Sequence, residues 1–234
     1  MNVLSKLHVL GSSSKGNGYI LEVGDDILII ECGFRLRDVY RKIGFKARKI
    51  RAVIVSHNHG DHAKYIDEYI RQGFPIMCPC CMVEEFNIPN RQLADMDNPF
   101  KIVPFDLYHD VPCSGFLVYH ALFGKLLFVT DTYMAPYRFE DIRLAIVEAN
   151  YSSKILHDNL INRTIPEVYA ERVKVSHMEL DKSIEILKRI HKLERVLLIH
   201  LSSQNSNADE FKNKVKSELG VPVDIAQANM TMEL

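Results

Sequence analysis

The densest group of potential metal ligands is the stretch Ser56-His57-Asn58-His59-Gly60-Asp61-His62, in which three imidazoles and one carboxylate fall within six residues. It follows the apolar run at residues 52–55, which is typical of a strand buried on both faces. Imidazole and carboxylate together suit zinc and its chemical neighbours. Histidines clustered beside a core would also be costly to desolvate without partners. We therefore predict a metal site here, with Gly60 permitting the turn that aims alternate side chains at one point. A polar surface loop is the alternative.

Other potential ligands follow apolar runs in the same way. One loop cannot complete two coordination shells, so further ligands must come from the ends of other strands. Three residues have that placement: His109 after residues 103–105, Asp131 after 126–129 and His200 after 196–199. Each alone could be a turn or capping residue. Together with the histidine-rich stretch, they favour metal ligation.

The elements that must position these residues are short apolar strands punctuated by Gly, Asn and Asp. Strands are expected at residues 7–10, 19–23, 27–30, 52–55, 101–105, 116–120, 126–129, 144–147, 196–199 and 221–225. Helices are expected at 34–43, 62–71, 180–193 and 207–219, the third opened by a capping box with Ser176 as cap and Glu179 three residues later. This order predicts an α/β (α+β) fold: a four-layer αββα sandwich of two mixed sheets, formed as one domain by residues 1–234.

Composition narrows the class of protein. The chain has 234 residues, 47% hydrophobic and 25% charged, which is ordinary globular composition. Its formal charge of -1 offers no general attraction to nucleic acid or to an anionic membrane. No apolar run approaches the roughly 20 residues of a membrane span, and residues 1–10 do not resemble a signal peptide. Five cysteines are an odd number, which favours free thiols in a reducing cytoplasm.

The pattern His-x-His-x-Asp-His, followed downstream by His, Asp and His, resembles the metallo-β-lactamase superfamily over about residues 7–202. The resemblance implies two divalent metal ions, with Zn²⁺ expected and Mn²⁺ the alternative. It places His57, His59 and His109 on the first ion. It places Asp61, His62 and His200 on the second, with Asp131 bridging the two. A bridging Asp131 is typical of the phosphodiesterase and nuclease branches.

Two further segments resemble the YycJ/WalJ-like branch of that superfamily. One is Gly11-Ser12-Ser13-Ser14-Lys15-Gly16-Asn17, and the other is His200-Leu201-Ser202-Ser203-Gln204-Asn205. The first is either a flexible turn or a nest of backbone and hydroxyl groups that receives a phosphate. We count Ser13, Asn17 and Ser202 as candidate substrate-binding residues. The chain departs from the family at Glu31, where an Asp is usual and supports the metal ligands.

Glu148-Ala149-Asn150-Tyr151 and Ser176-His177-Met178 resemble segments of tRNase Z and of YycJ-like proteins. The resemblance implies that Glu148 orients His177, which faces the scissile phosphate. A carboxylate on one imidazole nitrogen raises the histidine pKa and fixes its tautomer, as a general acid requires. We therefore predict Glu148, His177 and Asp61 as catalytic residues. The alternative makes His177 a residue of the first helical turn and Glu148 a surface charge.

Two kinds of relative within this branch suggest two functions. One kind is the bacterial DNA-processing nucleases, and the other is the viral anti-Pycsar phosphodiesterases, which degrade cyclic nucleotide immune signals. A near-neutral charge favours a small cyclic nucleotide, such as cCMP or cUMP, over a polyanion. The prediction is hydrolysis to a linear monophosphate in the cytoplasm, of the host if the protein is viral. The alternatives are a DNA or RNA nuclease and a non-catalytic nucleotide binder. The full ligand set argues against the binder, because a protein that only binds nucleotides needs no bridging Asp131. No membrane partner is expected.

Residues 151–169 contain Tyr151 and Arg163, which could stack on a base. This segment is expected either as a lid, reaching a neighbouring subunit because relatives are homodimers, or as an ordinary surface helix and loop. Cys78-Pro79-Cys80-Cys81 resembles half of a zinc knuckle, but no second cysteine pair follows, so reduced thiols are expected instead.

Overall fold

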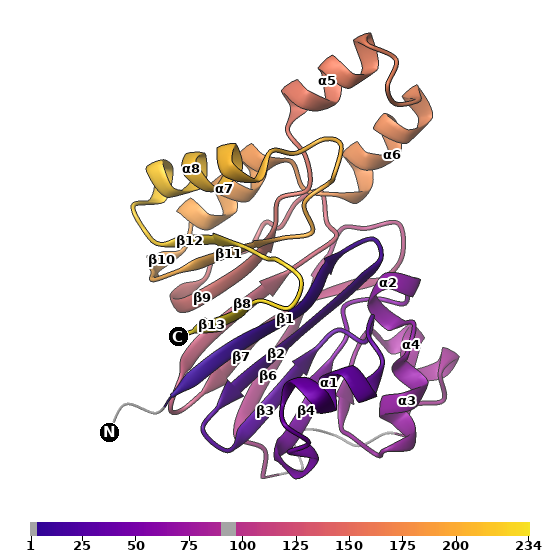
Figure 1. The fold of residues 1–234 in the computed structure, drawn as a ribbon, viewed down its shortest axis with the longest axis vertical. Helices are drawn as coiled ribbons and strands as arrows, with labels where there is room; N and C mark the ends of the chain where they lie inside the picture. The colour runs from indigo at the N-terminus through magenta and orange to yellow at the C-terminus, as the bar shows by residue number, and fades with distance from the viewer. Residues whose placement is uncertain (1–3, 90–96) are drawn as a thin grey trace. The chain divides into compact units, whose positions relative to one another are not determined.

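The computed structural model describes residues 4–89 and 97–234 (Figure 1). Residues 1–3 of the N-terminal stretch examined for a signal peptide lie outside the described residues. The chain divides into two compact units. The first unit comprises the chain up to residue 104 together with 118–124 and 226–234, and the second comprises 105–117 and 125–225.

The first unit is built on a six-stranded mixed sheet in the order β13-β1-β2-β3-β4-β5. Strands β13, β1, β2 and β3 pair antiparallel, whereas β3, β4 and β5 are parallel. Its strands are β1 (Ser5–Ser13), β2 (Gly16–Val23), β3 (Asp26–Ile30), β4 (Ile50–Ile54), β5 (Ile76–Met77) and β13 (Thr231–Glu233). Its helices are α1 (Leu36–Lys42), η1 (Ala47–Lys49), α2 (Gly60–Ala63), α3 (Ile66–Arg71) and α4 (Cys80–Glu85).

Helices α1 to α4 lie beside one face of this sheet (Figure 1). Alternate residues of a strand point to the same face, so Ile27 and Ile29 of β3 reach the helices together. They pack in one buried cluster with Val39 of α1, Ile66 and Tyr69 of α3. Burial of these apolar side chains is what fixes the helices on the sheet.

The second unit is built on a sheet in the order β12-β11-β9-β8-β7-β6, with β10 also paired to β9. Strands β8, β9, β11 and β12 run parallel to one another, so their carboxyl ends meet at one edge. Its strands are β6 (Phe100–Leu107) and β7 (Cys113–His120), both shared with the first unit by residue number, and β8 (Gly124–Val129), β9 (Glu140–Glu148), β10 (His191–Leu193), β11 (Val196–Ile199) and β12 (Val223–Ile225). Its helices are α5 (Ser153–Ile161), α6 (Glu167–Ser176), α7 (Leu180–Lys188) and α8 (Ala208–Leu219).

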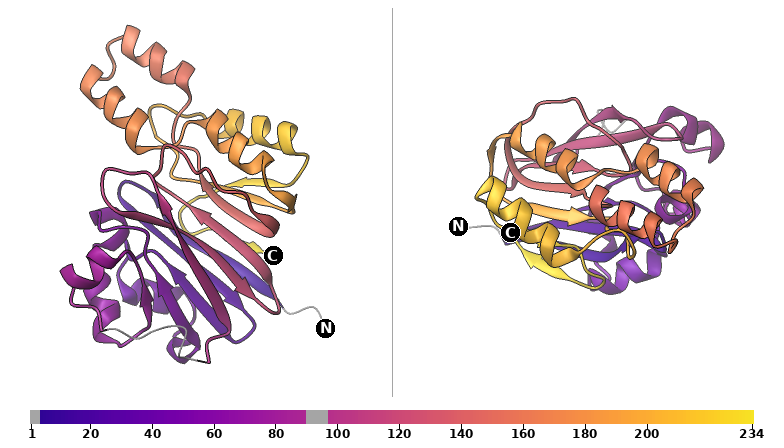
Figure 2. Two further views of the ribbon diagram at one scale, coloured as in Figure 1. Left: turned by 180° about the vertical axis from the view of Figure 1, so that it is seen from behind. Right: turned by 90° about the horizontal axis from the view of Figure 1, so that it is seen from above.

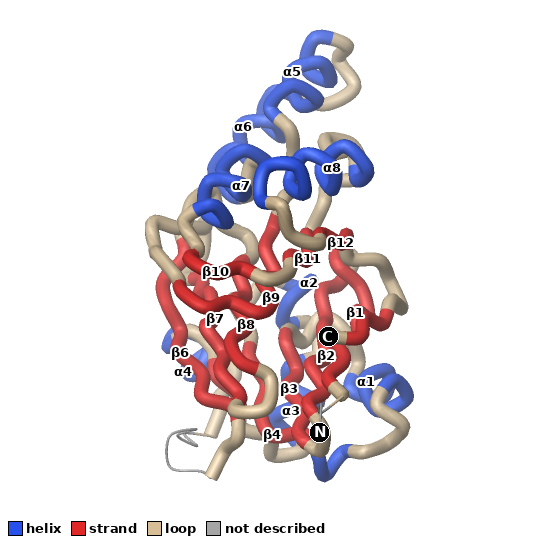
Figure 3. The backbone as a smooth tube through the Cα atoms, turned by 90° about the vertical axis from the view of Figure 1, so that its left-hand side faces the viewer, coloured by secondary structure: helices blue, strands red, loops and turns tan. Residues whose placement is uncertain are grey.

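The helices of the second unit form two groups (Figures 2 and 3). Helices α7 and α8 pack on the sheet through an apolar cluster that includes Ile184, Leu187 and Phe211. The α5–α6 hairpin stands out beyond them and has a small core of its own, which includes Tyr151 and Leu156. The predicted fold class, a mixed α/β protein with two mixed sheets, is confirmed. No helix in the described ranges is long and apolar enough to cross a bilayer.

Three local predictions are wrong. The helix expected at residues 180–193 ends at Lys188, and residues 191–193 instead form β10, which pairs parallel with β9. The capping box at Ser176 does not exist, because Ser176 ends α6 and α7 begins only at Leu180. The cap is Glu179, whose carboxylate accepts hydrogen bonds from the backbone N–H groups of Asp181 and Lys182. The expected loop at residues 11–18 is mostly strand: β1 continues to residue 13 and β2 begins at residue 16.

Candidate metal centre

The first unit holds four of the predicted metal ligands, which we call the first ligand group: His57, His59, Asp61 and His62. His57 lies three residues after the end of β4, and Asp61 and His62 lie in the first turn of α2. The ring centroid of His57 is 4.6 Å from that of His59 and 4.2 Å from that of His62. His62 Nε2 lies 3.2 Å from Asp61 Oδ2. Strand and helix together thus gather three imidazoles and one carboxylate.

Asn17, predicted as a substrate-binding residue, lies against this group. Its amide nitrogen donates to Asp61 Oδ2 and contacts His62 Nε2, each at 3.0 Å. Asn17 therefore contacts two predicted ligands at once, and its role in substrate binding stays a prediction.

Glu31, which replaces the usual Asp, supports the same group from the adjacent strand. Its side chain is fully buried, and Glu31 Oε1 lies 3.5 Å from His62 Nδ1. Both carboxylate oxygens also accept from the backbone N–H of Ser56, at 3.2 and 3.3 Å. Ser56 Oγ in turn lies 2.9 Å from His57 Nδ1. Glu31 thus contacts the predicted ligand His62 directly and, through Ser56, lies one contact away from His57; contacts of this kind fix ring orientation and tautomer.

Gly33 is the position in this group where a side chain cannot fit. A Cβ there would lie 2.1 Å from the carbonyl oxygen of Asp61 and 2.6 Å from the backbone nitrogen and oxygen of Asn17. The Gly33 N–H donates to the Asn17 carbonyl at 3.1 Å. Gly60, by contrast, has open space around its Cβ position and no left-handed backbone. The prediction that Gly60 supplies the necessary turn is therefore wrong, and Gly33 has the steric role.

Gly33→Ala is expected to lower the free energy of unfolding by about 3 kcal/mol or more, because backbone atoms on both sides would have to move. The matched control Gly60→Ala is expected to change it by no more than about 1 kcal/mol. Urea denaturation followed by circular dichroism measures both values. Equal stability of the two variants would contradict the steric role of Gly33.

The second unit holds a compact cluster of four titratable side chains, which we call the second ligand group: Asp131, Glu148, His177 and His200. One potential ligand atom from each lies within 4.8 Å of the others. Parallel strands deliver three of them to one edge, because β8 ends just before Asp131, β9 ends at Glu148 and β11 ends just before His200. His200 Nδ1 lies 2.7 Å from Asp131 Oδ1.

Three of the residues that follow strands have a left-handed backbone. The φ angles are 70° at Glu31, 43° at Asp131 and 54° at His200. Non-glycine residues rarely adopt this conformation, and it costs on the order of 1–3 kcal/mol each. At each position it turns the chain abruptly after the strand. The cost is acceptable only if the packed strands hold the turn in place.

Glu148 and His177 form the predicted pair. Glu148 Oε1 lies 2.7 Å from His177 Nδ1, and Asp131 Oδ1 lies 3.0 Å from the same nitrogen. Burial would lower the pKa of His177, but the charges of Glu148 and Asp131 outweigh it and raise that pKa to about 9. The other Glu148 oxygen, Oε2, accepts from the backbone N–H groups of Thr132 and Met178, both at 3.2 Å. The contact between Glu148 and His177 that the prediction requires is present, and the alternative of a surface charge at Glu148 is wrong because that side chain is buried. The catalytic roles of both residues stay predictions.

His109, the remaining predicted ligand, also lies in the second unit. Its Nδ1 donates to the carbonyl of Ser176 at 3.0 Å, which fixes the ring proton on that nitrogen. Its Nε2 lies 3.0 Å from Asp110 Oδ1. The sequence did not reveal three supporting contacts. The Ser176 carbonyl accepts from His109, and the backbone N–H of Thr132 donates to Glu148. The side-chain amide of Asn150 donates to the His200 carbonyl at 2.7 Å.

The other predicted substrate-binding residues are spread over both units. Ser13 Oγ accepts from the Lys15 N–H, and Ser202 Oγ accepts from the N–H groups of Gln204 and Asn205. Arg163 is exposed at the end of α5. Tyr151 is only 4% exposed and packs in the core of the α5–α6 hairpin, and this burial raises the pKa of its hydroxyl to about 12. Its burial corrects the prediction that the Tyr151 ring stacks on a base.

The two ligand groups have the donor chemistry of a divalent metal site. Imidazole nitrogens and carboxylate oxygens are borderline and hard donors that suit Zn²⁺ and Mn²⁺. His57, His62, Asp131 and His200 are buried, and buried titratable groups at such density require charge partners. The cysteines do not join a metal cluster among the described residues. Burial and the neighbouring Cys81 and Cys80 raise the pKa of Cys78 to about 12, which keeps that thiol protonated.

Comparisons with known proteins agree with the predicted resemblance. The family model of the anti-Pycsar protein Apyc1 matches residues 10–74. The exodeoxyribonuclease WalJ of Streptococcus pneumoniae is 22% identical over 94% of this chain and 91% of its own length. Ribonuclease Z of Parabacteroides distasonis is 24% identical, but the match spans only 51% of this chain and 49% of that enzyme.

Among solved structures, the metallo-β-lactamase fold protein YhfI from Bacillus subtilis has a TM-score of 0.75 at 20% identity. That similarity covers 99% of this chain and 100% of YhfI. At such identity, the likeness establishes the fold. The chain is therefore a protein of the metallo-β-lactamase fold that resembles, as its motifs predict, the WalJ-like and anti-Pycsar branch.

Proposed function

We propose that the chain is a metal-dependent phosphodiesterase that hydrolyses 3′,5′-cyclic nucleotides, such as cCMP and cUMP, to linear nucleoside monophosphates. In a bacterial cell this activity would counteract cyclic-nucleotide immune signalling. The family model of the anti-Pycsar protein over residues 10–74 supports the substrate class. The formal charge of -1 supports a small substrate over a polyanion.

The observation that carries the proposal is the cluster in which Glu148 and Asp131 both contact the Nδ1 atom of His177, at 2.7 and 3.0 Å. A histidine held by carboxylates on one nitrogen has its other nitrogen, Nε2, available to hold a proton for a substrate oxygen. Such a group is suited to protonating an alkoxide that leaves phosphorus.

We propose that His57, His59 and His109 hold one divalent ion, and Asp61, His62 and His200 a second, with Asp131 shared, Zn²⁺ being preferred over Mn²⁺. When bound, these ions would supply an activated water and offset charge on the phosphoryl oxygens. This chain's own residues orient the ligands through Asn17, Glu31 and the Ser176 carbonyl.

The proposed reaction balances simply. The oxygen of one water molecule joins phosphorus, and one ester bond between phosphorus and a ribose oxygen breaks. The departing ribose oxygen takes a proton from His177 Nε2, while Glu148 keeps the ring in place through Nδ1. One proton of the water stays on the oxygen that joins phosphorus, and the other is released and restores the proton on His177. The product is the linear nucleoside monophosphate.

A metal-dependent nuclease is the second candidate. The similarity to the exodeoxyribonuclease WalJ, which covers 94% of this chain, favours it. The same histidine and carboxylate cluster could cleave a phosphodiester in DNA or RNA. The two candidates differ in whether the substrate is a small monoanion or a polyanion.

The deciding experiment incubates the purified protein with Zn²⁺ or Mn²⁺ and a panel of cCMP, cUMP, cAMP and cGMP, beside linear duplex DNA and single-stranded RNA. Chromatography of the products is expected to show linear monophosphates from at least one cyclic nucleotide and intact nucleic acids. Degradation of DNA or RNA with intact cyclic nucleotides would reverse the ranking.

We also propose that the protein is a homodimer that associates through the α5–α6 hairpin. Val168 and Val175 of α6 are 83% and 61% exposed, and Ile161 at the end of α5 is 65% exposed. Val168 and Val175 are seven residues apart, so they lie on one face of the helix. Exposed apolar side chains gathered on one element favour an interface.

The double variant Val168→Asp/Val175→Asp is expected to weaken dimerisation by at least about tenfold, because the proposed interface would bury two charged carboxylates in place of two valines. Sedimentation equilibrium measures the dissociation constant. Leu122→Asp, a substitution of a leucine that is 57% exposed in the first unit, serves as the control. An unchanged dimer in the double variant would exclude α6 as the interface.

A further inference from the structure

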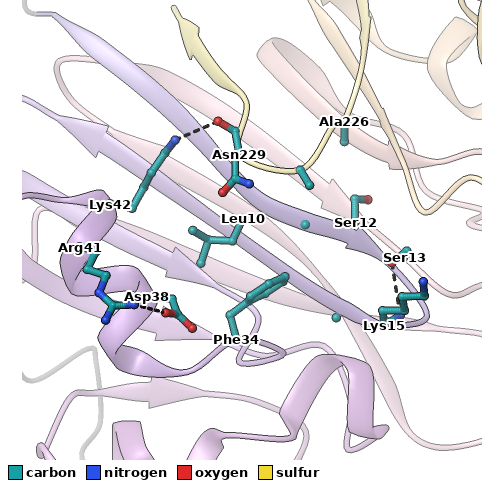
Figure 4. A pocket seen from close by; sticks show the side chains of 13 residues that line it. Leu10, Ser12, Ser13, Lys15, Phe34, Asp38, Arg41, Lys42, Ala226 and Asn229 are labelled. Atoms are coloured by element: carbon teal, nitrogen blue, oxygen red, sulfur yellow. Dashed lines mark hydrogen bonds and ion pairs between the residues drawn. The ribbon is translucent and has the colours of Figure 1, made fainter.

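A pocket of about 770 Å³ opens in the first unit, and none of the first ligand group lines it (Figure 4). Its walls come from the tip of the β1–β2 hairpin, from α1 and from residues 226–229, which precede β13. The volume lies within the range of small-molecule sites in proteins. The pocket is therefore large enough for a mononucleotide, and its lining includes Ser13, one of the predicted substrate-binding residues.

Phe34 gives the pocket a flat aromatic wall. Its ring rests on glycines of the hairpin: a Cβ at Gly11 would lie 2.6 Å from Phe34 Cζ, and one at Gly18 would lie 2.9 Å from Cδ2. The glycines of this segment thus let an aromatic ring lie directly on backbone. Figure 4 shows the ring of Phe34 between Leu10 and the hairpin tip. An aromatic face of this kind can stack on a nucleobase.

The rest of the lining is cationic. Lys15, Arg41 and Lys42 line the pocket, and Asp38 is the single carboxylate beside them. Asp38 Oδ1 accepts from Arg41 Nη1 at 3.3 Å, so that pair is neutralised. Lys42 Nζ donates to the neutral carbonyl of Asn229 at 3.0 Å, and no ion pair between described residues involves Lys15. Two ammonium groups therefore remain without a carboxylate, in a chain whose formal charge is -1.

Hydroxyl groups complete the lining. Ser12 and Ser13 lie at the tip of the hairpin next to Lys15, and both line the pocket (Figure 4). Hydroxyls and ammonium groups together are donors that suit a phosphate. One wall thus offers donors for an anion, and the other offers an apolar ring.

We propose that this pocket binds a small aromatic phosphate of the nucleoside monophosphate class, separately from the metal centre. Lys15 and Lys42 contact the phosphate, and Phe34 stacks on the base. The inference goes beyond the proposed phosphodiesterase activity and does not rest on it, because binding at this pocket is measured without turnover.

Isothermal titration calorimetry with CMP, UMP and AMP tests the proposal on the purified protein, with inorganic phosphate as the comparison ligand. The double variant Lys15→Gln/Lys42→Gln is expected to weaken nucleotide binding by about tenfold or more, because charged hydrogen bonds are lost. Phe34→Leu is expected to weaken nucleotide binding while leaving the binding of inorganic phosphate unchanged. Arg48→Gln is the control, since it removes a positive charge from η1 in the same unit, outside the pocket lining.

The variant His59→Ala/His62→Ala separates this site from the metal centre. Nucleotide binding that persists in this variant and is lost in Lys15→Gln/Lys42→Gln supports the pocket. The opposite pattern would assign the binding to the metal ligands and overturn the proposal. Inorganic phosphate binding as tightly as the nucleotides would also overturn it, because Phe34 would then contribute nothing.

Discussion

Asp131→Asn is expected to lower phosphodiester hydrolysis by at least about a thousandfold, because the proposed bridging carboxylate would become a neutral amide. Asparagine is the suitable replacement, since Asp131 has a φ of 43° and asparagine tolerates a left-handed backbone better than alanine does. The variant should therefore fold while losing metal. Turnover of a cyclic nucleotide and metal content by elemental analysis are the two measurements.

A matched control is available in Asp141, which has a φ of 56° and lies on β9 with its carboxylate 3.1 Å from Lys192 Nζ. Asp141→Asn makes the same chemical change in the same backbone conformation, away from the second ligand group. It is expected to leave both turnover and metal content unchanged. Equal loss in both variants would point to a general effect of the substitution on folding.

The first ligand group gives an independent check. Alanine at both His59 and His62 is expected to abolish turnover, because two imidazole ligands are removed. A wild-type rate in this double variant would show that the ligand assignment is wrong. Loss in this variant together with loss in Asp131→Asn would show that turnover requires both ligand groups.

The ends of strands were the part of the site that could be predicted from sequence. Residues 126–129 and 196–199 are short apolar runs that predict buried strands. A polar residue directly after such a strand lies at the edge of the sheet where the strand ends. Asp131 and His200 were therefore found correctly beside each other. The parallel pairing of β8, β9 and β11, which brings Glu148 between them, follows the same rule.

The supporting contacts could not be predicted, because they depend on residues far apart in the chain. Gly33 looks like an ordinary turn glycine until Asp61 and Asn17 are placed on either side of it. The left-handed backbone at Glu31 cannot be predicted from the residue type, since glutamate has no preference for positive φ angles. Gly60 lies among the predicted ligands in the sequence, but the space around its Cβ position is open.

The prediction of the helix boundary near Ser176 was wrong for a local reason. Ser176 and Glu179 match a capping box by spacing, yet Ser176 completes α6 and Glu179 itself caps α7. Both serine and a carboxylate can accept from free N–H groups at a helix start. The spacing alone does not decide between them, and the error moved His177 from a segment between two helices to the beginning of one.

His177→Gln is expected to lower hydrolysis of a cyclic nucleotide by about a hundredfold to ten-thousandfold, the usual contribution of a general acid. Glu148→Gln is expected to lower it by about tenfold to a hundredfold, because the ring loses its orienting carboxylate. The double variant should be little worse than His177→Gln alone, since the two side chains act as a unit. Steady-state rates of the three variants measure these effects.

The leaving group distinguishes proton donation from a structural role. A phosphodiester with a p-nitrophenolate leaving group needs no protonation of the departing oxygen, so His177→Gln should hydrolyse it at nearly the wild-type rate. His8→Gln is the control, because His8 Nε2 contacts the Glu22 carboxylate at 3.1 Å, a similar pair outside both ligand groups. That variant should retain both activities. Equal losses of His177→Gln on both substrates would mean that His177 positions the site without donating a proton, and the proposed reaction would need another acid.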